Sequence, residues 1–75
     1  MPESLADLPD GARGRIERID GALATRLAEV GLVPGSDVEV IRALPWGGPV
    51  LLDHQGFRFA IRRSDAAAVF VKGIP

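Results

Sequence analysis

Residues 26–40 read RLAEVGLVPGSDVEV, and they predict how one helix passes the chain to one strand. The helical pattern runs into Gly31, because glycine adopts the left-handed conformation that ends a helix without a Cβ penalty. The Pro34–Gly35 pair then favours a turn, since proline presets φ at one corner and glycine allows a positive φ at the next. Beyond the turn, Val38 and Val40 alternate with polar residues, as in a half-buried strand. The stretch shows no catalytic or phosphate-binding motif, so it describes a scaffold.

Length and composition limit the classes of protein to consider. A chain of 75 residues predicts a single domain over residues 1–75. It has no cysteine, which fits a reducing cytoplasm and leaves the fold without a disulfide. No secretory signal pattern is visible, and no apolar run approaches the ~20 residues of a membrane span. The net charge of −1 argues against a general polyanion binder, so no nucleic-acid partner is expected.

Five strands and one helix are expected around this junction. The helix is predicted over residues 21–30, with Asp20 as its N-cap and with Leu23, Leu27 and Val30 on one apolar stripe. The strand patterns cover residues 12–19, 37–44, 49–54, 57–62 and a short last segment through Val69 and Val71. This set of elements fits a small, strongly bent antiparallel barrel, which removes open edges by closing on itself.

Finer patterns give further expectations about these elements. Ile16 and Ile19 have opposite parity in the first strand, so a bulge between them is expected to turn both inward. The Gln55–Gly56 pair predicts a hairpin turn, and Ser64 is expected to cap a single helical turn. On the predicted helix, an exposed Arg26–Glu29 pair is expected at a spacing of three. One shared core is predicted from Leu23, Leu27, Leu32, Val38, Val40, Leu52, Phe59 and Ile61.

Four pieces of the sequence, in this order and at this spacing, resemble the ferrous iron transport protein A (FeoA) family. They are LADLPDG at 5–11, RLAEVGLVPGSDVEV at 26–40, PWGGPV at 45–50 and RFAIRRSDA at 58–66. The resemblance implies an SH3-like barrel and a small cytoplasmic, bacterial accessory protein that is not an enzyme and needs no cofactor. It also implies a partner, the membrane Fe(II) transporter FeoB with its cytosolic GTPase domain, through which alone the protein would meet a membrane. Trp46 and His54 depart from the aliphatic residues that are more usual at these two positions in the family.

Neither a catalytic site nor a metal site is predicted. His54 is the only histidine, and the chain has no cysteine or tyrosine, so a catalytic triad is not convincing. Asp53 lies beside His54, but adjacent residues of a strand point to opposite faces. His54 is therefore interpreted as an ordinary residue at a strand end, with a metal or partner contact as the alternative.

A loop and a group of arginines form the candidate partner-binding surface. The glycines of the Trp46-Gly47-Gly48 run fit a tight loop between strands, because no helix or Lys-Ser/Thr pair follows them to make a phosphate cradle. Trp46 is interpreted either as a lid folded back onto the core or as an exposed anchor for a partner. The arginines are interpreted either as a solvated face or as an electrostatic contact for an acidic partner. They are Arg42, Arg58, Arg62 and Arg63.

The function predicted from these features is that of a protein-interaction module in ferrous iron uptake. The alternative is a small-barrel module that binds a proline-rich peptide or nucleic acid in another system; binding of nucleic acid would weaken steeply with salt. A GTPase-activating protein would require an arginine finger on a flexible loop. Because the arginines lie mainly in predicted helix or strand, that third function is not favoured.

Overall fold

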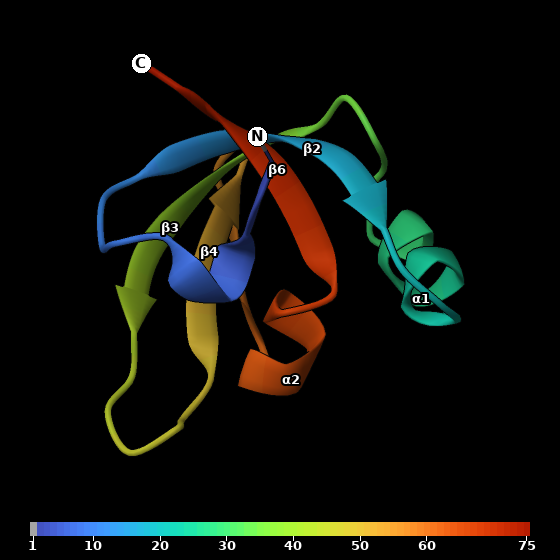
Figure 1. The fold of residues 1–75 in the computed structure, drawn as a ribbon. Helices are drawn as coiled ribbons and strands as arrows, with labels where there is room; N and C mark the ends of the chain where they lie inside the picture. Colours follow the sequence, from blue (N-terminus) through green and yellow to red (C-terminus); the bar gives the residue numbers. More distant parts are fainter. Residues whose placement is uncertain (1) are drawn as a thin grey trace.

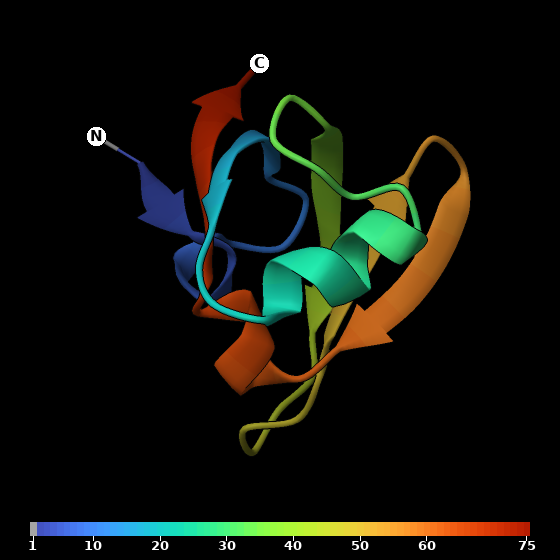
Figure 2. The ribbon, with the colours of Figure 1, turned by 90° about the vertical axis from the view of Figure 1, so that its right-hand side faces the viewer.

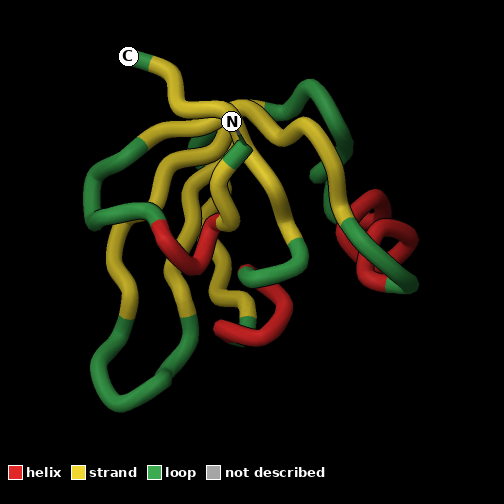
Figure 3. Tube along the Cα trace, viewed as in Figure 1, coloured by secondary structure: helices red, strands yellow, loops and turns green. Residues whose placement is uncertain are grey.

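The computed structural model describes residues 2–75 as one bent antiparallel sheet with short helices (Figure 1). Its strands, in chain order, are β1 (Glu3–Ser4), β2 (Arg13–Ile19), β3 (Asp37–Ala43), β4 (Val50–His54), β5 (Phe57–Ile61) and β6 (Val69–Ile74). The order across the sheet is β1-β6-β2-β3-β4-β5, and within the described residues β1 and β5 do not pair, so the sheet keeps two edges instead of closing on itself as expected. The helical segments are the 3-10 helix η1 (Leu5–Asp7), α1 (Leu23–Glu29) and α2 (Arg63–Ala66). Strands dominate the trace (Figure 3), which confirms the predicted mainly-β antiparallel fold and adds the short β1 as a sixth strand.

The predicted junction between helix and strand is confirmed in detail. Gly31 has a φ of 86°, and its N–H donates to the carbonyl of Ala28 at 3.0 Å. The N–H of Leu32 donates to the carbonyl of Leu27 at 2.9 Å, so the helix ends in a Schellman motif. Leu27 and Leu32 are both buried, and their side chains join the core. The glycine therefore ends α1 and turns the chain back toward the sheet.

The predicted start of the helix is wrong. Gly21 has a φ of 72°, which places a turn before the helix, and α1 begins at Leu23 after Ala22 as N-cap. The Asp20 carboxylate does not cap the helix, which has no side-chain cap, and it accepts a 2.8 Å hydrogen bond from Nε of Arg18 instead. The extra turn carries the chain away from β2 before α1 crosses the open side of the bent sheet (Figure 2).

Two side chains of the helical segment also differ from the prediction. Val30 is the C-cap of α1, with φ −102° and ψ 14°, and it is 61% exposed rather than part of the buried stripe. Arg26 pairs with Asp65 of α2, at 3.5 Å between Nη2 and Oδ2, instead of with Glu29. The helix therefore buries only Leu23 and Leu27, and the side chain of its C-cap residue, Val30, is exposed.

The predicted core and bulge are confirmed. The register of β2 against β6 shifts between Ile16 and Arg18, which leaves Ile16 buried and Ile19 packed against the core. Phe59 is half-buried at the core's margin. The other seven predicted core residues are buried together with Leu5, Ile16, Val50, Ala66, Val69 and Val71.

The turns near β5 are partly as predicted. Gln55 and Gly56 have φ values of 53° and 87°, and they join β4 to β5 as a two-residue hairpin. Ser64 does not cap α2, because Arg62 is the N-cap residue and Ser64 lies inside the helix. Phe57 follows the inward alternation of β5 but is 76% exposed, since it lies beyond the margin of the core.

Gly14 predicts a measurable cost of overpacking in the sheet. A Cβ atom at Gly14 would lie 2.8 Å from Cγ2 and 2.9 Å from Cβ of Val71, a buried neighbour. We expect Gly14→Ala to lower the free energy of unfolding by about 1–3 kcal/mol. Its cross-strand partner Gly73 has no atom within 4 Å of such a Cβ, so Gly73→Ala is the matched control. Chemical denaturation of both variants tests this, and equal losses would contradict it.

Candidate partner-binding surfaces

The 44–49 loop between β3 and β4, which contains Trp46, lies at one end of the molecule (Figure 2). Two backbone hydrogen bonds hold it: Leu44 N–H to Pro49 O at 3.0 Å, and Gly48 N–H to Pro45 O at 3.1 Å. Trp46 is 99% exposed, so the interpretation of this residue as a core lid is wrong. The indole is fully available for contact with another molecule.

Trp46 also has an unfavourable backbone conformation for its residue type. Its φ is 62°, and that of Gly47 is 72°, so two consecutive residues occupy the left-handed region. Glycine or asparagine fits such a position better than a bulky side chain. Strained residues of this kind cluster at binding and switch sites, where the side chain has a use that offsets the strain.

Three of the four predicted arginines lie on the exposed side of β3 to β5. Arg42 faces Leu51 in the β3–β4 register, and Leu51 faces Ala60 of β5. Arg58 faces Asp53 and pairs with it at 3.5 Å, while Arg62 directly follows β5. Among residues 2–75, Arg42 and Arg62 form no ion pair. The same face also carries Glu39 and Asp53, so its charge is mixed, and Arg42 and Arg62 are the two guanidinium groups of this set that are free to attract a partner.

Arg63 has a different position from the other three. It is half-buried in α2, and its Nη2 donates to the carbonyl oxygen of Leu44 at 3.4 Å. Its Nε is buried without a hydrogen-bond partner among the described residues. Through this hydrogen bond to Leu44, Arg63 positions the start of the 44–49 loop.

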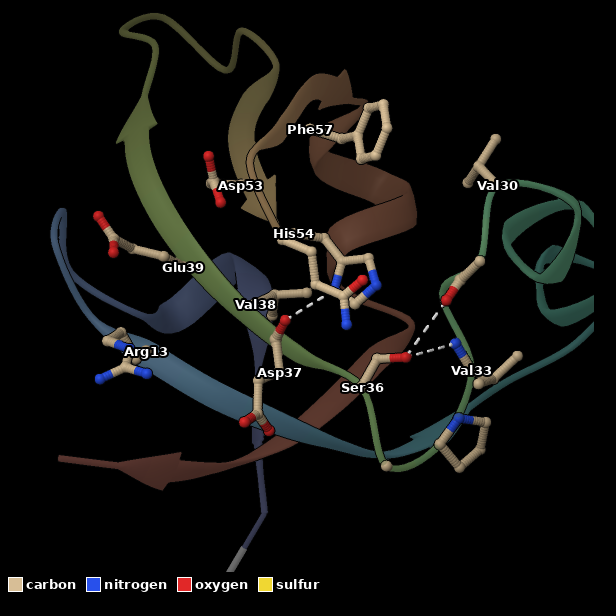
Figure 4. Close-up of a pocket in the computed structure, with 14 residues that line it drawn as sticks. Arg13, Val30, Val33, Ser36, Asp37, Val38, Glu39, Asp53, His54 and Phe57 are labelled. Atoms are coloured by element: carbon tan, nitrogen blue, oxygen red, sulfur yellow. Dashed lines mark hydrogen bonds between the residues drawn. The ribbon is translucent and has the colours of Figure 1, made fainter.

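A groove at the opposite end of β4 was not predicted from the sequence. It lies between the end of α1, the loop over residues 31–36 and the β4–β5 hairpin (Figure 4). Val30, Val33 and Phe57 are exposed along it, and His54 lies between them. The exposed Phe57 could have indicated this groove only if the sequence had shown that β5 is an edge strand.

His54 and Asp37 form the polar part of this groove. Nδ1 of His54 lies 2.9 Å from the carbonyl oxygen of Asp37, which only accepts, so Nδ1 carries the proton. The Asp37 carboxylate accepts hydrogen bonds from Nε and Nη2 of Arg15 at 2.8 and 3.2 Å. These hydrogen bonds are the main cause that lowers the pKa of Asp37. The histidine thus contacts backbone rather than a carboxylate, in agreement with its interpretation as a strand-end residue.

Within residues 2–75, no three His, Asp or Glu side chains gather closely enough to hold a metal ion. Neither α1 nor α2 has the length and apolar character of a helix that crosses a membrane.

We expect the purified protein neither to hydrolyse GTP nor to bind Fe(II) tightly. The sequence has one histidine and no cysteine, and its one glycine-rich loop lacks the Lys-Ser/Thr pair of a phosphate cradle. Calorimetry with Fe(II) and a GTP turnover assay test this expectation. A stoichiometric Fe(II) site with a micromolar or lower dissociation constant would contradict it, as would turnover that one point substitution abolishes.

Comparison with known proteins gives consistent matches over nearly the whole chain. A structure described as the iron uptake regulatory protein FeoA shares 31% identity and a TM-score of 0.86, with 99% of each chain covered. FeoA of Chlorobium tepidum shares 28% identity and a TM-score of 0.87, covering 97% of this chain and 71% of that one. FeoA of Stenotrophomonas maltophilia, described as a prokaryotic SH3 domain protein in complex with zinc, shares 33% identity and a TM-score of 0.81, covering 93% and 89%.

The match to a family model gives the same result independently of any single structure. The model described as the FeoA domain matches residues 3–73. The SH3-like fold expected from the resemblance is confirmed by the structural neighbours. This chain belongs to the FeoA family, which is linked to ferrous iron transport.

Proposed function

We propose that this chain is a non-enzymatic accessory protein of bacterial ferrous iron uptake, acting as one cytoplasmic domain on a FeoB-type membrane transporter. Membership of the FeoA family supports the link to iron transport. The description of the Stenotrophomonas maltophilia relative raises a role as a ferrous iron transport activating factor for that protein. The observation that carries the proposal for this chain is the fully exposed Trp46 in its left-handed turn.

The proposed contact has an apolar centre and a charged surround. Trp46 would supply most of the affinity, because burying an exposed indole releases about 25 cal/mol per Å² of apolar surface. Gly47 and Gly48 have no side chain to shield the indole. A Cβ atom at Gly48 would lie 3.1 Å from Cβ of Leu44 and 3.1 Å from the carbonyl oxygen of Pro45. Arg42, Arg58 and Arg62 would attract an acidic surface, while Arg63 holds the base of the loop, as described above.

A direct titration tests the proposed partnership. Purified FeoB in lipid nanodiscs is titrated with this chain by calorimetry, and we expect saturable binding of one chain to each transporter. A matched titration uses empty nanodiscs, which control for contact with lipid. Absence of binding to the transporter at about 100 μM, a weak affinity for a protein pair, would contradict the proposal.

We expect Arg42→Ala to slow association with FeoB several-fold and to reduce its dependence on salt. The reason is that exposed charges around an interface act mainly on the rate of encounter, and salt screens them. Lys72→Ala is the matched control, since Lys72 is an exposed cation on β6, in the other half of the sheet. Stopped-flow kinetics at two salt concentrations measure both variants. Equal effects of the two substitutions would contradict the predicted role of Arg42.

A further inference from the structure

The sheet has two edges of very different length. One is β1, which has two residues, and the other is β5, which has five. Natural proteins protect sheet edges by keeping them short, charged or covered, because an edge presents unpaired N–H and C=O groups to other chains. Figure 2 shows β5 as the outer border of the sheet, on the side where α1 ends. The long edge is therefore the one that a further strand could join.

The hairpin fixes which backbone groups of β5 face outward. His54 and Phe57 flank the two-residue turn, so they form a hydrogen-bonded pair, and the pairs alternate along the ladder. Phe57, Phe59 and Ile61 therefore aim their backbone groups at β4, whereas Arg58 and Ala60 aim theirs away from it. Outside the sheet, no backbone hydrogen bond of residues 2–75 uses Arg58 or Ala60.

The inner side of this edge is apolar. A groove beside β5 is lined by Val30, His54, Phe57, Arg58 and Phe59. Val30 and Phe57 are exposed there, and the two come from different elements, the end of α1 and the start of β5. A strand paired with β5 would place alternate side chains on this side of the sheet. Apolar side chains at those positions would cover Val30 and Phe57.

The outer side of the same edge is cationic. Arg58 and Arg62 lie on either side of Ala60 and are both exposed. Arg58 already pairs with Asp53 at 3.5 Å, but its side chain is 75% exposed and has room for a second carboxylate. Residues directly opposite each other on neighbouring strands interact most strongly, and opposite charges stabilise the pairing. The neighbours that suit this side are therefore acidic.

We propose that the β5 edge binds an extended segment of a partner protein by strand addition, and that acidic and apolar residues alternate in this segment. Backbone pairing with Arg58 and Ala60 gives the affinity, and the two sides of the edge select the side chains. This site goes beyond the proposed contact at Trp46, because it uses the backbone of β5 and the groove at the far end of β4.

The test uses a short blocked peptide of alternating glutamate and valine, added to the intact protein and followed by NMR. We expect amide shifts along β5 and at Val30, with amide exchange at Arg58 and Ala60 slowed at least about tenfold at saturation. A peptide with lysine in place of glutamate is expected to bind at least about tenfold more weakly. The absence of shifts at β5 at about 1 mM glutamate peptide would overturn the proposal, as would equal binding of the two peptides.

Two N-methylated peptides separate strand pairing from simple attraction of charge. One carries the methyl groups on the valine amides and the other on the glutamate amides. Because the amides of alternate residues point to opposite edges of an extended strand, only one of the two peptides has methyl groups on the edge that faces β5. We expect one peptide to lose binding at least about tenfold and the other to keep it. Equal binding of both would overturn the proposal, and so would dimerisation of the protein that protects the same amides without peptide.

Protein variants distinguish this site from the contact at Trp46. Ala60→Pro removes the outward N–H, which an edge strand tolerates, and is expected to weaken binding of the glutamate peptide at least about tenfold. Trp46→Ala is expected to leave that binding unchanged, because Trp46 lies at the other end of β4. A folded Ala60→Pro protein that binds the peptide normally would overturn the proposal. Thermal unfolding confirms that each variant is folded.

Discussion

Leu27→Ala is expected to lower the free energy of unfolding by about 2–5 kcal/mol, the range for deleting a buried leucine side chain. Leu27 is 7% exposed, and its carbonyl accepts the hydrogen bond from Leu32 that closes the helix end. The substitution leaves a cavity between α1 and the sheet, next to Leu32. A domain of this size without a disulfide has a total stability of roughly 3–5 kcal/mol, so the variant is expected to be largely unfolded at 37 °C.

Val30→Ala is the matched control for this prediction. Val30 is the C-cap residue of the same helix, three residues after Leu27, but its side chain is exposed. We expect a change within about 0.5 kcal/mol, as for most surface substitutions. Urea denaturation followed by circular dichroism measures both variants. A loss at Val30 as large as that at Leu27 would contradict the assignment of the buried helix face.

Trp46→Ala is expected to weaken binding to FeoB by more than about 1 kcal/mol and to leave the fold unchanged. The binding loss follows because tryptophan side chains at the centre of interfaces carry a large share of the affinity. The fold is unaffected because the indole makes no contribution to the core, being 99% exposed. Calorimetric titration measures the binding, and thermal unfolding measures the stability.

Two further variants sharpen this prediction. Trp46→Gly removes the indole and also relieves the positive φ of 62°, so it should weaken binding equally while stability is kept or raised. Val33→Ala truncates another exposed apolar side chain, on the 31–36 loop, and should leave binding unchanged. If Trp46→Gly keeps full affinity, the indole has no role in the contact.

Much of the scaffold could be predicted from the sequence because local chemistry determines it. Gly31 ends the helix through its positive φ, and the alternation through Val38 and Val40 gives the buried face of β3. The opposite parity of Ile16 and Ile19 indicated the bulge in β2, since only an extra residue turns both side chains inward. Each of these features depends on residues close together in the chain.

The errors arise where distant parts of the chain decide the outcome. Arg26 has Glu29 at helical spacing, but its guanidinium pairs instead with Asp65 of α2, which lies far along the chain. Val30 continues the apolar stripe of the predicted helix, yet it is exposed because α1 ends beside the margin of the sheet. Periodicity gives the face on which a residue lies, and it does not give the distance from that face to the margin of the core.

The candidate site was predictable only in part for the same reason. Trp46 and the glycines beside it stand out in the sequence, but exposure of the indole depends on whether the 44–49 loop folds onto the core. The half-buried position of Arg63 depends on contact between α2 and Leu44, nineteen residues earlier in the chain. The groove beside β5 combines residues from α1 and the β4–β5 hairpin, and no local pattern connects them.

The central claim is that the partner binds at the 44–49 loop, and mapping the contact on the protein tests it most directly. Isotope-labelled protein is titrated with unlabelled FeoB in nanodiscs, and intensity losses of the backbone amides are recorded by NMR. We predict that the largest losses fall on residues 44–49 and on the neighbouring Arg42 and Arg62, and that Trp46→Ala abolishes them. Losses confined to other parts of the surface, with the 44–49 loop unchanged at saturation, would contradict the claim.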